Sequence, residues 1–210
     1  MYTLYYMPGA ASFVVHWLLI ETGAAHEVRR VDGEAGEHKK PAYLALNPNG
    51  LVPTLIVDGQ PVYEAAALAL LLAERHPEAR LAPLVGTRAR SMYLQWMMHL
   101  ANTLQPAYRH WFYPAEAAGE THAESAKESA RQRIEAVWSR VDAHLAANGP
   151  WIAGDQLTAV DFHAAMLARW SRNMPRPATE WPAVARHVAA MKARPSFRLL
   201  NERECLTEWT

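Results

Sequence analysis

The chain has 210 residues, of which 50% are hydrophobic and 20% are charged, as in ordinary soluble globular proteins. Lysine plus arginine and aspartate plus glutamate each number 21, so charge gives no reason to expect nucleic acid or an anionic membrane as a partner. The longest apolar run, Ala65 to Ala73, is far shorter than the roughly twenty residues of a membrane span, and the start, Met1–Tyr5, lacks the basic region of a secretion signal.

The first predicted elements are a short strand and a helix joined by a tight turn. Leu4–Tyr6 is typical of a strand, Pro8-Gly9 of a turn, and Ser12 of the residue that caps a helix. Apolar residues then recur up to Thr22-Gly23, which predicts the extent of the helix. The simplest role for Ser12 is this cap.

The segment Asn47–Pro53 is predicted to form a bend just before a second run of strand residues. Pro53 cannot donate to a sheet, and it pushes Val52 toward extended geometry. If the Val52-Pro53 bond is cis, Val52 presents its N–H and C=O outward like an unpaired edge strand, where an extended peptide can dock. The simpler alternative is that the prolines punctuate an ordinary loop.

A hairpin and a helix are predicted to follow the bend. Thr54–Val57 and Pro61–Tyr63 flank Asp58-Gly59, a strong signal for a two-residue turn. A helix beginning near Glu64 is apolar almost all round, so we expect it to be buried. The order βαβ…ββα describes a thioredoxin-like domain over residues 1–78.

The stretch 76–86 holds two prolines and a glycine and is predicted to link this domain to an all-helical domain over residues 88–210. Apolar residues at positions 93, 96, 97, 100 and 104, and at 134, 137, 138, 141 and 145, have helical spacing, and we expect them in the core. Pro106 must end or kink the first of these helices. The aromatic stretch Tyr108–Tyr113 is then placed to wall a cleft.

Thr158 and Asp161 have the spacing of a capping box, which predicts that Asp161 is a folding residue and not a catalytic acid.

His16, on the first helix, is expected to be a packed, hydrogen-bonded residue and not a base. The ten histidines show no metal-binding spacing, so we predict no metal site. The one cysteine, Cys205, excludes an internal disulfide and suits a reducing compartment, so we expect a cytoplasmic protein.

Four short motifs follow one another along the chain: Tyr5–Ser12, Asn47–Pro53, Tyr63-Glu64 and Thr158–Asp161. Together they make the whole chain resemble bacterial glutathione S-transferases, especially the beta class. The resemblance implies an α/β thioredoxin-like N-terminal domain followed by an all-α C-terminal domain. It also implies that glutathione is the co-substrate, that a small hydrophobic electrophile receives its thiol in a detoxification reaction, and that the protein is a homodimer.

The resemblance also assigns roles in glutathione binding. Val52 and Pro53 would pair with the cysteinyl main chain, while Glu64 and the helix start at Ala65 would hold the γ-glutamyl end. Lys39 or Lys40 would bind the glycyl carboxylate.

The second domain carries the remaining implied positions. A histidine and a lysine that relatives offer from the first long helix map onto Gln105 and Pro106. The electrophile would lie against the aromatic residues Trp111, Phe112, Tyr113 and Trp170.

Activation of the glutathione thiol sets an energetic requirement. Lowering its pKa from about 8.5 to about 6.5 needs roughly 2.7 kcal/mol of preference for the anion. A helix N-terminus contributes about 0.3–1 kcal/mol, and a hydrogen bond to a charged group about 1.5–3 kcal/mol. One hydroxyl at a helix start therefore suffices; Ser12 is the first candidate and Tyr6 the second.

Four departures from the family pattern, at Ala11, Ala65, Gln105 and Pro106, support an alternative. Beta-class members have a cysteine where this chain has Ala11, which excludes mixed-disulfide chemistry at that position. Many relatives have a serine where it has Ala65, so one hydrogen bond to the γ-glutamyl carboxylate is absent. The alternative is a catalytically weak or inactive binding or scaffold protein of the same fold; a third hypothesis is a specialised lyase or isomerase.

Overall fold

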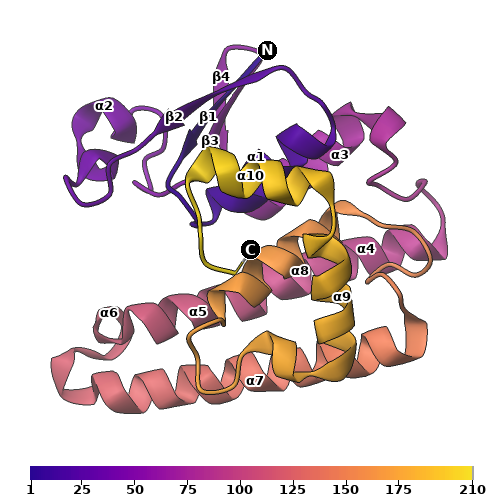
Figure 1. The fold of residues 1–210 in the computed structure, drawn as a ribbon. Coiled ribbons are helices and arrows are strands. Elements are labelled where there is room, and N and C mark those ends of the chain that lie inside the picture. The colour runs from indigo at the N-terminus through magenta and orange to yellow at the C-terminus, as the bar shows by residue number, and fades with distance from the viewer. Residues whose placement is uncertain (210) are drawn as a thin grey trace. The chain divides into compact units, whose positions relative to one another are not determined.

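The computed structural model describes residues 1–209, and the chain divides into two units (Figure 1). The first unit holds Met1–Ala82 together with the segment from Lys192 onward, and the second unit holds Pro83–Met191. This division differs from the sequence prediction in one respect: the last helix groups with the first unit, although the prediction placed all of residues 88–210 in one helical domain.

Four short strands form the mixed sheet of the first unit: β1 (Tyr2–Tyr6), β2 (His26–Arg30), β3 (Thr54–Val57) and β4 (Gln60–Tyr63). They lie in the order β2-β1-β3-β4, with β1 and β2 parallel and the other neighbours antiparallel. The predicted hairpin is confirmed, and its turn residues Asp58 and Gly59 both have the positive φ that a tight two-residue turn requires. This sheet confirms the predicted thioredoxin-like domain.

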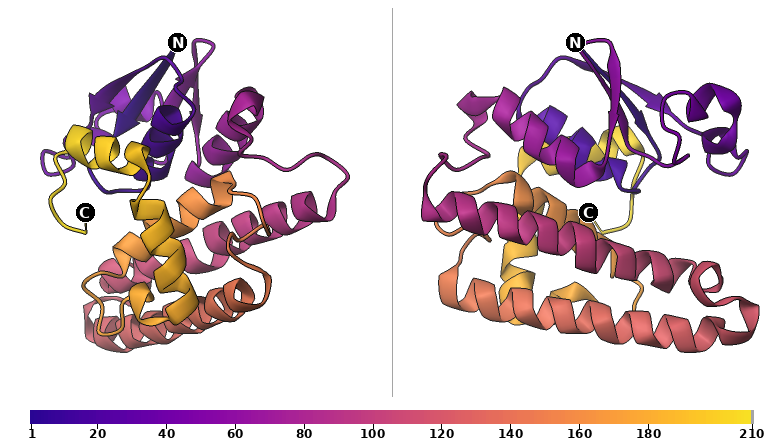
Figure 2. Two further views of the ribbon diagram at one scale, coloured as in Figure 1. Left: turned by 45° about the vertical axis from the view of Figure 1, so that its right-hand side comes forward. Right: turned by 180° about the vertical axis from the view of Figure 1, so that it is seen from behind.

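Three helices of the first unit, α1 (Ser12–Glu21), α3 (Ala65–Arg75) and α10 (Pro195–Glu204), lie on one face of the sheet (Figure 2). Short helical segments fill the connections: η1 (Glu37–Lys39), α2 (Pro41–Leu44) and η2 (Pro77–Ala79). Helix α10 packs on α1, where Trp17 Nε1–H donates to Ser196 Oγ at 2.9 Å. The prediction that α3 is buried all round is wrong: Ala67 is exposed, because only the side of α3 toward the unit's interior is covered.

The second unit is built mainly from helices. It contains α4 (Arg88–His99), η3 (Leu100–Leu104), α5 (Gln105–Phe112), α6 (Pro114–Ala118), η4 (Glu120–His122), α7 (Ala123–Asn148), α8 (Ala159–Trp170), η5 (Ala178–Glu180) and α9 (Pro182–Lys192). Both predicted apolar stripes are buried. The predicted interruption near Pro106 is also confirmed, because η3 is a π-helical segment between α4 and α5. A proline lacks a backbone donor and crowds the preceding turn, and the wider turn accommodates it.

The predicted capping box at the start of α8 is confirmed. The N–H of Thr158 donates to Asp161 Oδ2 at 2.8 Å, and the Thr158 hydroxyl donates to the same oxygen at 3.1 Å. The other oxygen of Asp161 accepts from the N–H of Ile152 at 2.9 Å and from His187 Nε2–H at 3.0 Å. Asp161 is fully buried, so these four donors take the place of water.

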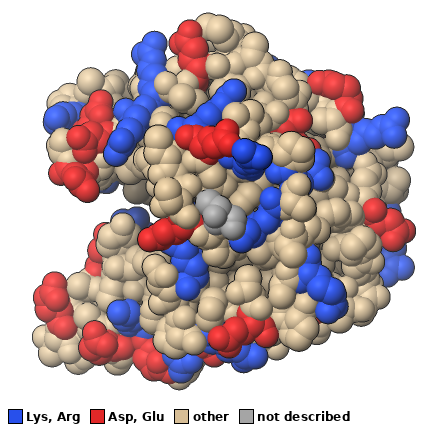
Figure 3. Space-filling model, viewed as in Figure 1, with Lys and Arg blue, Asp and Glu red and all other residues tan. Residues whose placement is uncertain are grey.

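On the face shown in Figure 3, lysine and arginine side chains alternate with aspartate and glutamate, and neither sign dominates. Within residues 1–209, no helix is long and apolar enough to cross a membrane. The same residues contain no group of three or more His, Cys, Asp or Glu side chains that could hold a metal ion.

Candidate functional site

The turn that leads from β1 into α1 is closed by Ser12. The Ser12 hydroxyl donates to the carbonyl oxygen of Met7 at 3.0 Å and accepts from the N–H of Met7 at 3.2 Å, and the side chain is fully buried. The prediction of Ser12 as the N-cap is wrong, because Ala11 occupies that place and Ser12 is the first helical residue. The first-turn amides of a helix have no intrahelical acceptor, so this end of α1 favours an anion.

A buried carboxylate from α10 fastens this turn. Glu204 Oε2 accepts from the N–H of Gly9 at 2.8 Å, and Oε1 accepts from His16 Nδ1–H at 2.9 Å. Both His16 and Glu204 are buried, which confirms His16 as a packed, hydrogen-bonded residue. Sequence reasoning missed Glu204, because 195 positions separate it from Gly9 and no local pattern links them.

Tyr6 ends β1 beside this cluster. Its ring lies 5.6 Å from the ring of His16. Burial, with a further contribution from the negative charge of Glu204, raises the pKa of Tyr6 above its ordinary value. The hydroxyl therefore stays protonated at neutral pH and remains a hydrogen-bond donor. Within residues 1–209, it makes no hydrogen bond.

The bend before β3 has the predicted geometry. The Val52-Pro53 peptide bond is cis, which meets the condition for a Val52 main chain that faces outward. No hydrogen bond within residues 1–209 uses the N–H or C=O of Val52, which is half-buried. The main chain of Val52 thus offers one donor and one acceptor that the protein does not satisfy itself.

Glu64 occupies the cap position at the start of α3 in an uncommon conformation. Its φ is 80° and its ψ is 108°, a region where residues other than glycine are strained. Its side chain is exposed, whereas Ala65 is buried behind it. Strain of this kind persists when the surrounding structure holds it, and it concentrates at ligand-binding positions.

Strand register brings these segments to one end of the sheet. Thr54 pairs with Tyr5 on one side and with Tyr63 on the other. The residues that flank this row are Tyr6 at the end of β1, Val52-Pro53 before β3 and Glu64 after β4. Segments far apart in sequence therefore meet at a single edge, where an unpaired main chain, a carboxylate and a helix N-terminus are close together.

The two lysines predicted to bind a carboxylate differ in their surroundings. Lys39 Nζ donates to the carbonyl oxygen of Gly50 at 2.9 Å, so its ammonium already holds the loop before Val52. Lys40 is exposed and directly precedes α2. In the second unit, Gln105 is half-buried at the start of α5.

The predicted electrophile-binding residues fall into two groups. Phe112 and Trp170 lie together, with ring centroids 6.4 Å apart, and both contact the buried ring of Tyr108. Trp111 lies under Lys127 Nζ at 4.8 Å, and the ring of Tyr113 faces the guanidinium of Arg109 at 5.2 Å. Phe112 and Tyr113 are 47% and 55% exposed, so part of their apolar surface is accessible.

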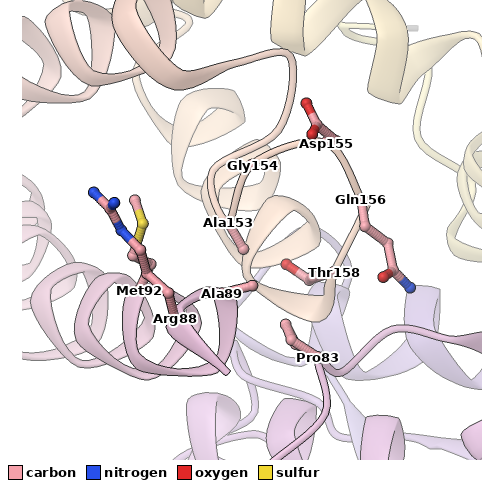
Figure 4. A pocket seen from close by; sticks show the side chains of 9 residues that line it. All are labelled: Pro83, Arg88, Ala89, Met92, Ala153, Gly154, Asp155, Gln156 and Thr158. Carbon is pink, nitrogen blue, oxygen red and sulfur yellow. The ribbon is translucent and has the colours of Figure 1, made fainter. Parts of the chain in front are cut away.

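A separate hollow of about 330 Å³ lies in the second unit between the start of α4 and the loop before α8 (Figure 4). Its walls are mainly small or apolar, and its two charged side chains are Arg88 from α4 and Asp155 from the loop. None of the residues predicted to act on glutathione or an electrophile lines it.

Two family models match the chain. The model described as the N-terminal domain of glutathione S-transferase matches residues 1–74, and the one described as its C-terminal domain matches residues 96–195. Glutathione S-transferase GST-4.5 of Xanthomonas campestris is 32% identical over 169 residues, which cover 80% of this chain and 81% of that protein.

Solved structures agree with this match. A glutathione transferase homologue from Sulfitobacter, with bound glutathione, has a TM-score of 0.90 at 26% identity, covering 97% of this chain and 98% of that one. A beta-class glutathione S-transferase from Sphingomonas chungbukensis has a TM-score of 0.84 at 26% identity, covering 98% of this chain and 100% of that one. A thioredoxin-like unit and a helical unit are thus shared along nearly the whole length. The chain belongs to the glutathione S-transferase family.

Proposed function

We propose that this chain binds glutathione in its first unit and joins the glutathione sulfur to a small hydrophobic electrophile. Family membership supports the activity, and the Sulfitobacter relative was solved with glutathione bound. In the reaction, the glutathione thiol loses its proton, the thiolate forms a bond to the electrophilic carbon, and the leaving group departs with its electron pair.

The main support for this proposal is the strand register, in which Thr54 pairs with Tyr5 and with Tyr63. This register brings the unpaired main chain of Val52 and the side chain of Glu64 to the same end of the sheet. The cysteinyl residue of glutathione is the size of one strand residue. It pairs with Val52 through its own N–H and C=O, as an added β-strand would. Glu64 then binds the γ-glutamyl ammonium, and the α3 amides from Ala65 onward receive its carboxylate.

Glu64→Gln is expected to weaken glutathione binding about tenfold, since a hydrogen bond to a charged group contributes roughly 1.5–3 kcal/mol. Titration calorimetry of wild type and variant measures this change. Glu27→Gln, on the exposed strand β2, is the matched control and should bind glutathione like wild type. Equal affinities for Glu64→Gln and wild type would remove Glu64 from the site, and no heat at millimolar glutathione would contradict the proposed function.

The thiolate is stabilised by the first-turn amides of α1 and by one hydroxyl. The sequence ranks Ser12 before Tyr6, but two observations support the reverse order. The only hydrogen of the Ser12 hydroxyl is donated to Met7, whereas Tyr6 keeps its hydrogen for a ligand. Ser12 then acts by holding the turn, and Tyr6 donates to the sulfur.

Tyr6→Phe is expected to reduce the ultraviolet thiolate band of bound glutathione at pH 7 at least about threefold, because losing a charged hydrogen bond raises the thiol pKa by roughly one unit. Ser12→Ala should leave the band close to that of wild type. A loss of the band in Ser12→Ala alone would restore Ser12 as the thiolate ligand.

The remaining assignments complete the proposal. Lys40 binds the glycyl carboxylate, while Lys39 supports the loop, and Gln105 is available as a polar contact. Phe112, Trp170, Trp111 and Tyr113 hold the apolar part of the electrophile. We further propose a cytoplasmic homodimer that acts in detoxification; the single cysteine, which suits a reducing compartment, supports this location.

The alternative is a protein that binds glutathione without turnover. Ala11, Ala65, Gln105 and Pro106 favour it, because relatives carry other polar groups at these four positions. Heat of glutathione binding without conjugation of an aryl halide would support the alternative.

A further inference from the structure

Two buried side chains hold one carbonyl group directly before Val52. The hydroxyl of Tyr43, on α2, donates to the oxygen of Leu51 at 2.7 Å, and Asn47 Nδ2–H donates to the same oxygen at 2.8 Å. Both side chains are buried. A carbonyl oxygen has two lone pairs, so the Leu51 oxygen is saturated by these two donors.

The two donors are fixed in turn. The Tyr43 hydroxyl lies 2.9 Å from Thr54 Oγ1, which is fully buried at the start of β3. Asn47 Oδ1 accepts from the N–H of Asn49 at 3.1 Å, which sets the orientation of the amide group. The Leu51 carbonyl is therefore tied to α2, to its own loop and, through Thr54, to the sheet.

Holding this oxygen also orients the Val52 amide. The C=O of Leu51 and the N–H of Val52 belong to the same planar peptide group, so fixing one fixes the direction of the other. The N–H of Val52 is also the donor that the protein leaves unpaired. A donor held in its bound direction before the ligand arrives avoids the entropy of ordering a loop on binding.

We propose that Tyr43 and Asn47 are positioning residues that aim the main chain of Val52 at the cysteinyl residue of glutathione. This inference rests on the proposed function. Neither residue needs to touch the ligand, because both act through the Leu51–Val52 peptide group. Tyr2 on β1 serves as the control for Tyr43. Its hydroxyl also makes a hydrogen bond within the first unit, to His76 Nε2 at 3.2 Å.

The test is a double-mutant cycle between protein and ligand. The two ligands are S-methylglutathione and its analogue with a methyl group on the cysteinyl nitrogen, which removes the ligand's donor and blocks its approach to Val52. Titration calorimetry measures both ligands on wild type, Tyr43→Phe and Tyr2→Phe, and thermal unfolding measures the stability of each protein.

Tyr43→Phe is expected to bind S-methylglutathione about fivefold more weakly than wild type, because the binding free energy contributed by about one hydrogen bond is lost. The same variant should bind the N-methylated analogue as tightly as wild type does. Tyr2→Phe should bind both ligands with the affinity of wild type, even if its melting temperature falls as far as that of Tyr43→Phe. Should Tyr43→Phe fail to fold, Asn47→Ala replaces it in the same cycle.

Two outcomes would contradict different claims. If methylation weakens binding equally in wild type and in Tyr43→Phe, then Tyr43 does not aim Val52, and the inference is wrong. If methylation leaves wild-type binding unchanged, Val52 does not pair with the ligand, and the proposed binding mode itself fails.

Discussion

Asp161→Ala is expected to lower the free energy of unfolding by about 3–5 kcal/mol. The buried carboxylate accepts four hydrogen bonds, from Thr158 twice, Ile152 and His187. Alanine leaves those donors buried without partners, and unpaired buried donors are more unfavourable than the net gain of any single bond. The same change removes the carboxylate from the first turn of α8, where negative charge is favourable.

Urea unfolding of wild type and three variants measures this effect. Thr158→Ala removes only the cap hydroxyl and should lower the free energy of unfolding by about 1 kcal/mol. Asp155→Ala, an exposed residue of the loop before α8, should change it little. If Asp161→Ala were no more destabilising than Thr158→Ala, the carboxylate would not be the centre of this network.

Acid is expected to destabilise the second unit through His163, on α8. This side chain is fully buried, and neither ring nitrogen has a hydrogen-bond partner. Burial lowers its pKa from 6.5 to about 4. Between these values the unfolded chain binds a proton that the folded chain does not, so stability falls as the pH falls through this window. The loss amounts to about 3 kcal/mol between pH 7 and pH 4.

His163→Leu should remove this part of the acid sensitivity. The free energy of unfolding of variant and wild type is measured with urea at several pH values. The difference, variant minus wild type, should increase by about 3 kcal/mol as the pH falls from about 7 to 4. His122→Leu is the control, because His122 is exposed. The free energy of unfolding of this variant should depend on pH as that of wild type does. Parallel pH profiles for His163→Leu and wild type would contradict the expectation.

Local patterns predicted much of the fold. The hairpin at Asp58-Gly59, the capping box at Thr158–Asp161 and the interruption at Pro106 each depend on residues within a few positions of one another, and all are present. The bend at Val52-Pro53 was predictable for the same reason. Such features are encoded by turn, cap and proline chemistry that tertiary packing does not override here.

Features that depend on distant residues were not predictable. Glu204 reaches Gly9 from the last helix, and α10 groups with the first unit through contacts such as Trp17 with Ser196. Ser12 illustrates a second limit. A serine before an apolar helix fits a cap, yet it lies one position inside the helix, because its hydroxyl finds both partners on Met7.

In the proposed binding mode, the main chain of Val52 serves as a β-strand partner for the cysteinyl residue of glutathione. Calorimetry of the wild-type protein with S-methylglutathione and with its cysteinyl N-methyl analogue tests it most directly. The single methyl group is expected to weaken binding at least about tenfold, because it removes the ligand's donor and keeps the ligand's carbonyl group away from Val52. Equal affinity for the two ligands would show that glutathione binds without this pairing.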